Sequence, residues 1–219
     1  MNTESRLTQN WIDLGIVTGF VGFFAYALPQ MPFVRGRLHD LLFMGFGPLV
    51  CIAAIAWYVF FRRHADSVSN QLAHVFLFQA GLAFTFMSTM QMSILSLLRQ
   101  YYRSAAEGAE QELWQKIFRG VSPTQLGLDF AFDIFVSVGT VLLGVQVMRH
   151  PRFWRWFGAL GMLIGAAGLT VNFITFPENS VESGLVDPGP FFGIWMGLAL
   201  VRMWRCRTWR PDPEPATPA

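Results

Sequence analysis

The stretch that most constrains the fold is residues 122–149, a long apolar run that carries two aspartates, Asp129 and Asp133. Ser122 has the character of a helix N-cap, and Pro123 suits the first helical position. A helix of about 26 residues is roughly 39 Å long, which is enough to cross a bilayer. The stretch therefore predicts a membrane-spanning helix that begins at Ser122.

The two aspartates share one face of this helix with small and polar residues. At helical spacing this face contains Asp129, Asp133, Ser137, Thr140 and Gly144. An ionised carboxylate that faces lipid costs about 2.5 kcal/mol or more, so the polar face is expected to meet other helices or a water-filled cavity. Two interpretations stay open: hydrogen bonding to neighbouring helices near the membrane interface, or a site for an ion, a proton or a ligand.

Composition places the whole chain in the membrane class. Its 219 residues are 53% hydrophobic and 14% charged, whereas soluble chains average about 25% charged residues. Only helices and closed barrels satisfy their backbone inside a bilayer, and the long apolar runs favour helices. We expect an all-α bundle in a single domain over residues 1–210, followed by a disordered tail over residues 211–219.

The apolar runs predict six transmembrane helices, which makes the chain a polytopic integral membrane protein. The expected spans are residues 11–27, 41–61, 71–98, 123–149, 153–176 and 188–204. Between the third and fourth spans, Leu113, Trp114, Ile117 and Phe118 form an apolar face opposite charged residues. This pattern predicts one short amphipathic helix that lies on the membrane surface or caps the bundle.

Glycines recur at helical spacing in two of the spans. The first span contains Gly15, Gly19 and Gly22, and the fifth contains Gly158, Gly161, Gly165 and Gly168. Small residues in such rows let helix backbones approach closely. These faces predict tight helix contacts, and they also offer surfaces for homo- or hetero-oligomers.

The distribution of basic residues predicts the orientation. With six spans both termini lie on one side, and placing them in the cytoplasm collects ten of the 16 basic residues there. These ten are Arg6, Arg62, Arg63, Arg149, Arg152, Arg155, Arg202, Arg205, Arg207 and Arg210. We therefore expect a multi-pass protein of the cell membrane with cytoplasmic N- and C-termini.

In this orientation several polar residues fall in the outer half of the membrane. They are Asp129, Asp133, Gln91, Asn172, Thr175 and Asp187. Polar groups are costly in hydrocarbon, so we expect them to meet inside the bundle. The first five are the candidate ligand-binding residues of an outward-facing polar pocket between the third and sixth spans. The alternative is a network of interhelical hydrogen bonds without a ligand.

Several other functions find little support in the sequence. The only lysine, Lys116, lies outside the spans, so no retinal Schiff base is expected. A haem between two histidines is disfavoured because only His74 lies inside a span. Met87, Met90 and Met92 suggest copper only weakly, because the three do not share a helical face. The sequence indicates no catalytic residue, metal site or nucleic-acid partner, and it identifies no cofactor.

The C-terminal half resembles a known group of proteins. The residues that carry the resemblance are Leu142-Leu143-Gly144 before the basic turn, Phe157-Gly158-Ala159-Leu160-Gly161 after it, and the connection NFITFPENSVESGLVDPGPFFGIW. They are similar to a family of uncharacterised bacterial six-helix membrane proteins known as a domain of unknown function. The resemblance covers roughly residues 123–200. It implies six helices and a bacterial cytoplasmic membrane, and it implies no activity.

Three hypotheses about function follow from these patterns. The first is a protein that binds or transports a small polar ligand or cation through the polar pocket. The second is a structural or regulatory subunit that acts through its glycine faces and its surface helix. The third is a lipid-directed enzyme that uses the two carboxylates as acid and base. The carboxylate pair is the only sequence feature that supports this hypothesis.

Overall fold

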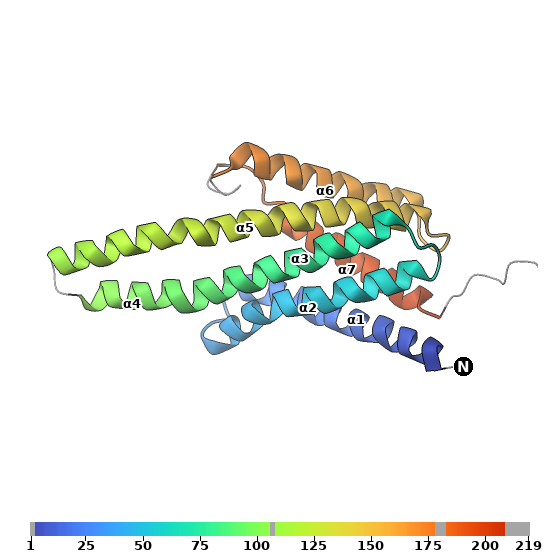
Figure 1. Ribbon diagram of the computed structural model, residues 1–219, viewed down its shortest axis with the longest axis horizontal. Coiled ribbons are helices and arrows are strands. Elements are labelled where there is room, and N and C mark those ends of the chain that lie inside the picture. The colour runs from blue at the N-terminus through green and yellow to red at the C-terminus, as the bar shows by residue number, and fades with distance from the viewer. Residues whose placement is uncertain (1–2, 106–107, 178–182, 209–219) are drawn as a thin grey trace, which may run out of the picture.

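The computed structural model is an elongated bundle of helices (Figure 1). It describes residues 3–105, 108–177 and 183–208, and every regular element in these ranges is helical. The elements are α1 (Thr3–Ala27), η1 (Leu28–Gln30), α2 (Arg37–Arg62), α3 (Val68–Met90), η2 (Gln91–Leu95), α4 (Ser96–Ser104), α5 (Ala109–Arg149), α6 (Arg155–Thr175) and α7 (Gly189–Cys206). The all-α prediction is confirmed for these residues, and the predicted tail at 211–219 lies outside them.

Five stretches of helix are long and apolar enough to cross a membrane. They are Ser5–Gln30, Arg37–Arg62, Val68–Ser104, Ala109–Arg149 and Arg155–Thr175. The chain is therefore a multi-spanning membrane protein. The sixth predicted span corresponds to α7, which is not among these five and whose 18 residues include Arg202 and Arg205. Its status as a sixth span stays a prediction.

The predicted helix start at Ser122 is wrong. Ser122 and Pro123 lie inside α5, which begins at Ala109 and runs for 41 residues. The separate surface helix is accordingly not confirmed, because the residues assigned to it form the first turns of α5. Proline removes one backbone hydrogen bond from a helix, but here α4 lies alongside and supports the continuous helix. The ring of Tyr101 in α4 stacks on Trp114 in α5, with 4.8 Å between ring centroids.

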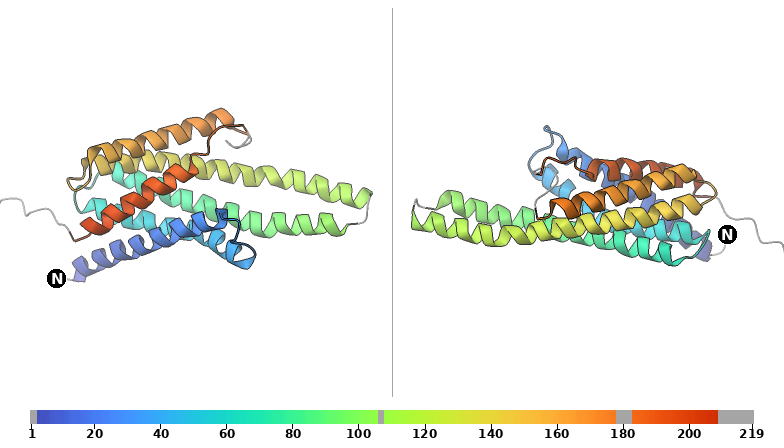
Figure 2. Two further views of the ribbon diagram at one scale, coloured as in Figure 1. Left: turned by 180° about the vertical axis from the view of Figure 1, so that it is seen from behind. Right: turned by 90° about the horizontal axis from the view of Figure 1, so that it is seen from above.

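Two very long helical segments form a hairpin that extends past the other helices (Figures 1 and 2). One contains α3, η2 and α4 and spans 37 residues, and the other is α5 with 41 residues. At about 1.5 Å per residue each is roughly 55–60 Å long, about twice the thickness of a hydrocarbon core. The tip of the α4–α5 hairpin therefore lies beyond the membrane if the rest of the bundle spans it.

Glycines set the closest approach between helices, as the sequence predicts. A methyl group at Gly144 of α5 would come 2.7 Å from the carbonyl oxygen of Gly158 in α6. Further along α6, the ring of Trp195 in α7 covers Gly161. In α1, Gly19 faces Leu200 of α7. The glycine faces are thus occupied by contacts within the chain, and oligomer formation through them stays a prediction.

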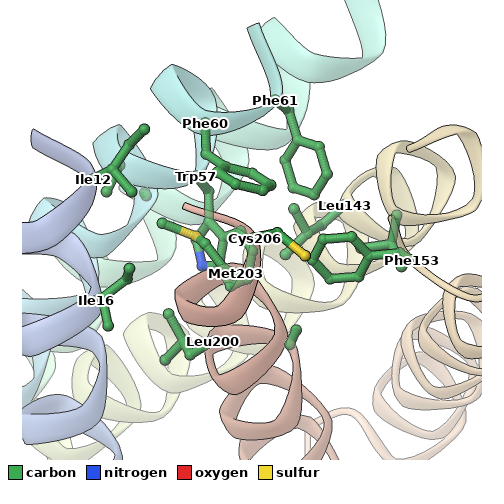
Figure 3. Close-up of a cluster of buried hydrophobic side chains, with 14 of the residues drawn as sticks. Ile12, Ile16, Trp57, Phe60, Phe61, Leu143, Phe153, Leu200, Met203 and Cys206 are labelled. Carbon is green, nitrogen blue, oxygen red and sulfur yellow. The ribbon is translucent and has the colours of Figure 1, made fainter. Parts of the chain in front are cut away.

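The largest buried cluster lies toward one end of the bundle. Figure 3 shows Ile12 and Ile16 from α1, aromatic rings from α2, and Leu200, Met203 and Cys206 from α7 meeting there. Hydrogen bonds also connect the helices in this region. The Trp195 indole donates to the carbonyl oxygen of Phe157 at 2.9 Å, and the Arg63 guanidinium donates to the Arg207 carbonyl oxygen at 3.0 Å.

The start of α1 and the end of α7 lie at the same end of the bundle. Arg207 forms an ion pair with Asp13 at 3.4 Å, and Arg63 also donates to the side-chain oxygen of Gln9 at 3.1 Å. Arginines gather at this end, which we call the basic end. Its residues are Arg62, Arg63, Arg149, Arg152, Arg155, Arg202, Arg205 and Arg207.

The α5–α6 contact yields a matched pair of glycine substitutions in one helix. We predict that Gly144→Ala lowers the free energy of unfolding by about 1–3 kcal/mol, because the added methyl meets backbone atoms of α6 that cannot move aside. Gly127→Ala has open space around it, so it should be neutral or stabilise by up to about 1 kcal/mol. Unfolding curves in mild detergent measure both. Equal effects of the two substitutions would contradict this packing.

Candidate functional site

The polar face of α5 lies away from the basic end, and contacts with α3 fix its register there. Leu77 packs against Gly139, and the ring centroid of Phe84 lies 5.2 Å from that of Phe132. Because the two helices run antiparallel, these contacts place Gln91 level with residue 125. Gln91 is therefore about one turn beyond Asp129 and two turns beyond Asp133 along the helix axis.

Helix α6 covers another side of the polar face. A methyl group at Gly168 would lie 3.0 Å from the Ser137 hydroxyl oxygen, and the ring of Phe176 lies 4.4 Å from that of Phe130. The antiparallel register then places Asn172 level with Asp133, and Thr175 level with Asp129. Two of the three predicted partners of the aspartates thus lie at the expected depth, whereas Gln91 is displaced.

A third carboxylate and a tyrosine reach the same region. Asp187 accepts a hydrogen bond at 2.8 Å from the backbone nitrogen of Gly189, the first residue of α7. A methyl group at Gly189 would lie 2.9 Å from the hydroxyl oxygen of Tyr26 in α1. The negative charge of Asp187 interacts electrostatically with the carboxylates of Asp129 and Asp133. All three carboxylates interact in the same way with the Tyr26 hydroxyl.

These residues differ in their exposure to solvent. Asp129 and Asp133 are partly buried between helices, and Asp187 is exposed at the mouth of the region. Among the described residues no salt bridge neutralises any of the three. The group formed by Tyr26, Asp129, Asp133 and Asp187, which we call the acidic cluster, is therefore rich in negative charge and hydrogen-bond acceptors.

Aromatic rings form one wall beside the acidic cluster. Tyr26 lies 5.1 Å from Phe46 of α2, measured between ring centroids, and Phe46 lies 4.6 Å from Phe84 of α3. Phe132, which directly precedes Asp133, completes the row at 5.2 Å from Phe84. Four helices contribute to this wall, so the cluster has carboxylates on one side and ring surfaces on the other.

Two buried polar side chains beside the acidic cluster have no hydrogen-bond partner within the part of the chain that the structure describes. They are the Ser137 hydroxyl and the Asn172 side-chain nitrogen, and their residues are 0% and 6% exposed. An unsatisfied buried polar group costs about 1–3 kcal/mol. The Thr175 hydroxyl differs, because it donates to the Val171 carbonyl oxygen at 3.0 Å. A water molecule or a polar ligand between α5 and α6 would satisfy both Ser137 and Asn172.

Sequence reasoning found some of these residues and missed others. It singled out Asp129, Asp133, Asn172 and Thr175, and it placed Ser137 on the same helical face without a role. It missed Tyr26, whose signal was only a tyrosine at the end of the first apolar run. Gln91 was expected in the pocket, but it lies partly buried at the start of η2. Its backbone nitrogen donates to carbonyl oxygens of α3, and its side chain makes no hydrogen bond with a described residue.

The chemistry of the acidic cluster suits a cation, a proton or a hydrogen-bond donor. It offers acceptor oxygens from α1, α5 and the start of α7 without a basic partner. In the described ranges no three histidine, cysteine or acidic side chains are close enough to hold a metal ion. The present arrangement therefore favours a proton or a larger cation over a tightly coordinated metal ion.

Comparison with known proteins identifies the family but no activity. Residues 35–204 match the family described as a domain of unknown function (DUF4386). The chain belongs to this family. The match confirms the resemblance seen in the C-terminal half and extends it to α2–α7. No curated protein and no solved structure matches the chain.

The basic end contains His150, the one buried histidine in the part of the chain that the structure describes, at the turn between α5 and α6. His150 is 2% exposed, and the rings of Phe60, Phe61 and Phe153 surround it at 5.1, 5.7 and 5.3 Å. Burial, together with the smaller effect of the positive charges of His64, Arg152 and Arg202, lowers the pKa of His150 to about 4. The imidazole is therefore neutral at physiological pH, and its Nδ1 accepts a hydrogen bond from the Arg152 backbone nitrogen at 3.3 Å.

This histidine predicts a pH dependence of stability. An unfolded histidine titrates near pH 6.5, so between about pH 6.5 and 4 the unfolded chain binds a proton at His150 that the folded chain does not. The contribution of the neutral His150 to the free energy of unfolding is fully present above pH 6.5 and is lost as the pH falls toward 4. Unfolding midpoints in detergent should therefore fall over this range, and less steeply in His150→Phe.

His39, which is partly exposed in the first turn of α2 at the opposite end of that helix, provides the control. His39→Gln should keep the slope of the wild type, because this side chain lies away from the basic end. A His150→Phe slope equal to that of the wild type would contradict the burial of a neutral imidazole at this position.

Proposed function

We propose that this protein binds or transports a cation, protons included, through the acidic cluster. The observation that carries the proposal is the meeting of uncompensated carboxylates from α5 and the start of α7 beside two unpartnered buried side chains, Ser137 and Asn172. Carboxylates within a membrane are costly and mark ion or proton pathways in many proteins. The ligand-binding residues in this proposal are Asp129, Asp133, Asn172 and Thr175, with Tyr26 added and Gln91 at the periphery.

Charge supports a cation over an anion or a neutral ligand. An anion would meet three carboxylates and no basic side chain in salt-bridge contact with them. A cation would be attracted by these carboxylates, and the faces of Tyr26 and Phe132 add a favourable cation–π surface. The hydroxyl oxygen of Ser137 supplies a further acceptor near the same depth. The unpartnered Asn172 side-chain nitrogen is a donor, so it would bind a water molecule or a carboxylate beside the cation rather than the cation itself.

We predict that Asp133→Asn abolishes cation-linked charge movement. In proteoliposomes on a solid-supported membrane, a rapid jump in the concentration of protons, Na⁺ or tetramethylammonium should produce a transient current for at least one of the three. Asp133→Asn should reduce this current to less than about a tenth, because the substitution removes the most enclosed charge of the acidic cluster. Asp129→Asn should weaken it.

Asp40 provides a matched control, because its exposed carboxylate lies in the first turn of α2 outside the acidic cluster. Asp40→Asn should keep the current of the wild type. If the wild type gives no current with any of the three cations, or if Asp133→Asn leaves the current unchanged, the acidic cluster is a structural network and the proposal fails.

We infer further that the protein lies in the cell membrane with both termini in the cytoplasm. The start of α1 and the end of α7 share the basic end, and an excess of arginine marks the cytoplasmic side of membrane proteins. Asp133 lies 16 residues from Arg149 in α5, or about 24 Å along the helix. The acidic cluster then lies in the outer half of the bilayer, and the α4–α5 hairpin projects outward.

Cysteine labelling tests this orientation. With Cys51 and Cys206 replaced by alanine, Ser104→Cys at the tip of the hairpin should react with a membrane-impermeant maleimide in intact cells. Ser69→Cys, near the start of α3 at the opposite end, should react only after lysis. The reverse pattern would place the acidic cluster on the cytoplasmic side.

A second candidate function is that of a regulatory or structural subunit. The α4–α5 hairpin favours it, because exposed apolar side chains such as Leu97 and Leu113 lie on a segment that extends beyond the bundle. A partner that copurifies with the wild type and is lost with Leu97→Ser and Leu113→Ser would support this candidate. For a lipid-directed enzyme, the carboxylate pair is still the only supporting feature.

A further inference from the structure

A surface groove lies between α5 and α6 at the basic end, far from the acidic cluster. Its volume is about 750 Å³, and its lining includes Arg149 from the end of α5 and Arg155 from the start of α6. Val145, Met148 and Met162 line it along the two helices, and His150, Pro151 and Phe153 line it at the turn between them. The groove is therefore basic at one end and apolar along the helices.

The close packing of the two helices shapes this groove. Gly144 and Gly158 bring the backbones of α5 and α6 together, and the side chain of Met162 lies over Gly144, where an added methyl would meet it at 2.8 Å. Met148 lies over Gly158 in the same way. The two methionines thus flank the helix contact, and flexible thioether side chains of this kind adapt to an irregular apolar ligand.

The two arginines at the end of the groove are available for an anion. Both side chains are exposed, and neither forms a salt bridge with a carboxylate within the described ranges. Other arginines of the basic end are engaged: Arg207 pairs with Asp13, and Arg202 donates to the Arg152 carbonyl oxygen at 2.8 Å and lies 4.8 Å from the Trp154 ring.

The groove also sits where a membrane interface is expected. The candidate spans end at Arg149 and begin again at Arg155. Between and beside them, Trp154 and Trp156 are 55% and 62% exposed and stack on each other with 5.8 Å between centroids. Exposed tryptophans are typical of the headgroup region of bilayers. A ligand whose charged part lies level with the arginines would extend its apolar part into the hydrocarbon.

We propose that this groove binds one anionic phospholipid, with its phosphate between Arg149 and Arg155 and an acyl chain along Val145, Met148 and Met162. Guanidinium groups bind phosphate oxygens with paired hydrogen bonds. A free phosphate would leave the apolar length of the groove empty. A zwitterionic lipid would place the positive charge of its headgroup beside the two arginines. The charge and shape of the lining therefore both favour an anionic lipid.

Native mass spectrometry of the full chain in detergent tests this proposal. The protein is mixed with equal amounts of phosphatidylglycerol and phosphatidylcholine that carry the same acyl chains, and the bound lipid is identified. The wild type should retain one phosphatidylglycerol in preference to phosphatidylcholine. At about 1 kcal/mol for each arginine, the double variant Arg149→Gln/Arg155→Gln should lose about 30-fold in this preference.

The double variant Arg99→Gln/Arg103→Gln provides a control with the same change in charge at exposed positions of the α3–α4 segment. It should keep the lipid preference of the wild type, and both variants should keep its unfolding midpoint within a few degrees. Millimolar glycerol 3-phosphate should not displace the bound lipid. Equal losses in the two double variants, or full displacement by glycerol 3-phosphate, would overturn the proposal.

Discussion

The structure depends on covering the polar face of α5. A helix that carries Asp129, Asp133, Ser137 and Thr140 on one face cannot present that face to hydrocarbon without a cost of several kcal/mol. Helix α3 packs on α5 through Leu77 and Phe84, and α6 packs on it through its glycines. The row of small residues in α6 is needed because only glycine lets its backbone approach closely enough to enclose Ser137. The tight contacts between α5 and α6 thus follow from the need to keep the polar face of α5 away from hydrocarbon.

The sequence predicted what depends on periodicity. Apolar runs predicted six spans, of which five are long and apolar enough to cross a membrane, and glycine spacing predicted that another helix approaches the fifth span closely. It was wrong where a local signal competed with a tertiary contact. Ser122 and Pro123 have the form of a helix start, yet pairing with α4 through Tyr101 and Trp114 carries α5 through them. Local capping signals contain no information about such a neighbour.

The residues that could not be predicted are those whose position depends on the register between helices. Gln91 is at the correct end of α3, but Leu77 opposite Gly139 fixes α3 so that Gln91 passes the level of Asp129 by about one turn. Tyr26 joins the acidic cluster because α7 begins beside it and Gly189 leaves space for its hydroxyl. Neither fact follows from one helix alone, since register is a property of pairs of helices.

The two ends of the bundle differ in the groups that they enclose, although neither half is fully satisfied, because His74 Nδ1 near the start of α3 also has no partner among the described residues. At the basic end, Arg63, Arg207 and Trp195 all donate to defined acceptors, and His150 is held neutral among phenylalanine rings. At the other end, Ser137 and Asn172 are unpartnered, and the carboxylates have no basic partner in the described ranges. A polar ligand at the proposed site would therefore satisfy Ser137 and Asn172 without disturbing the contacts at the basic end that set the register of the helices.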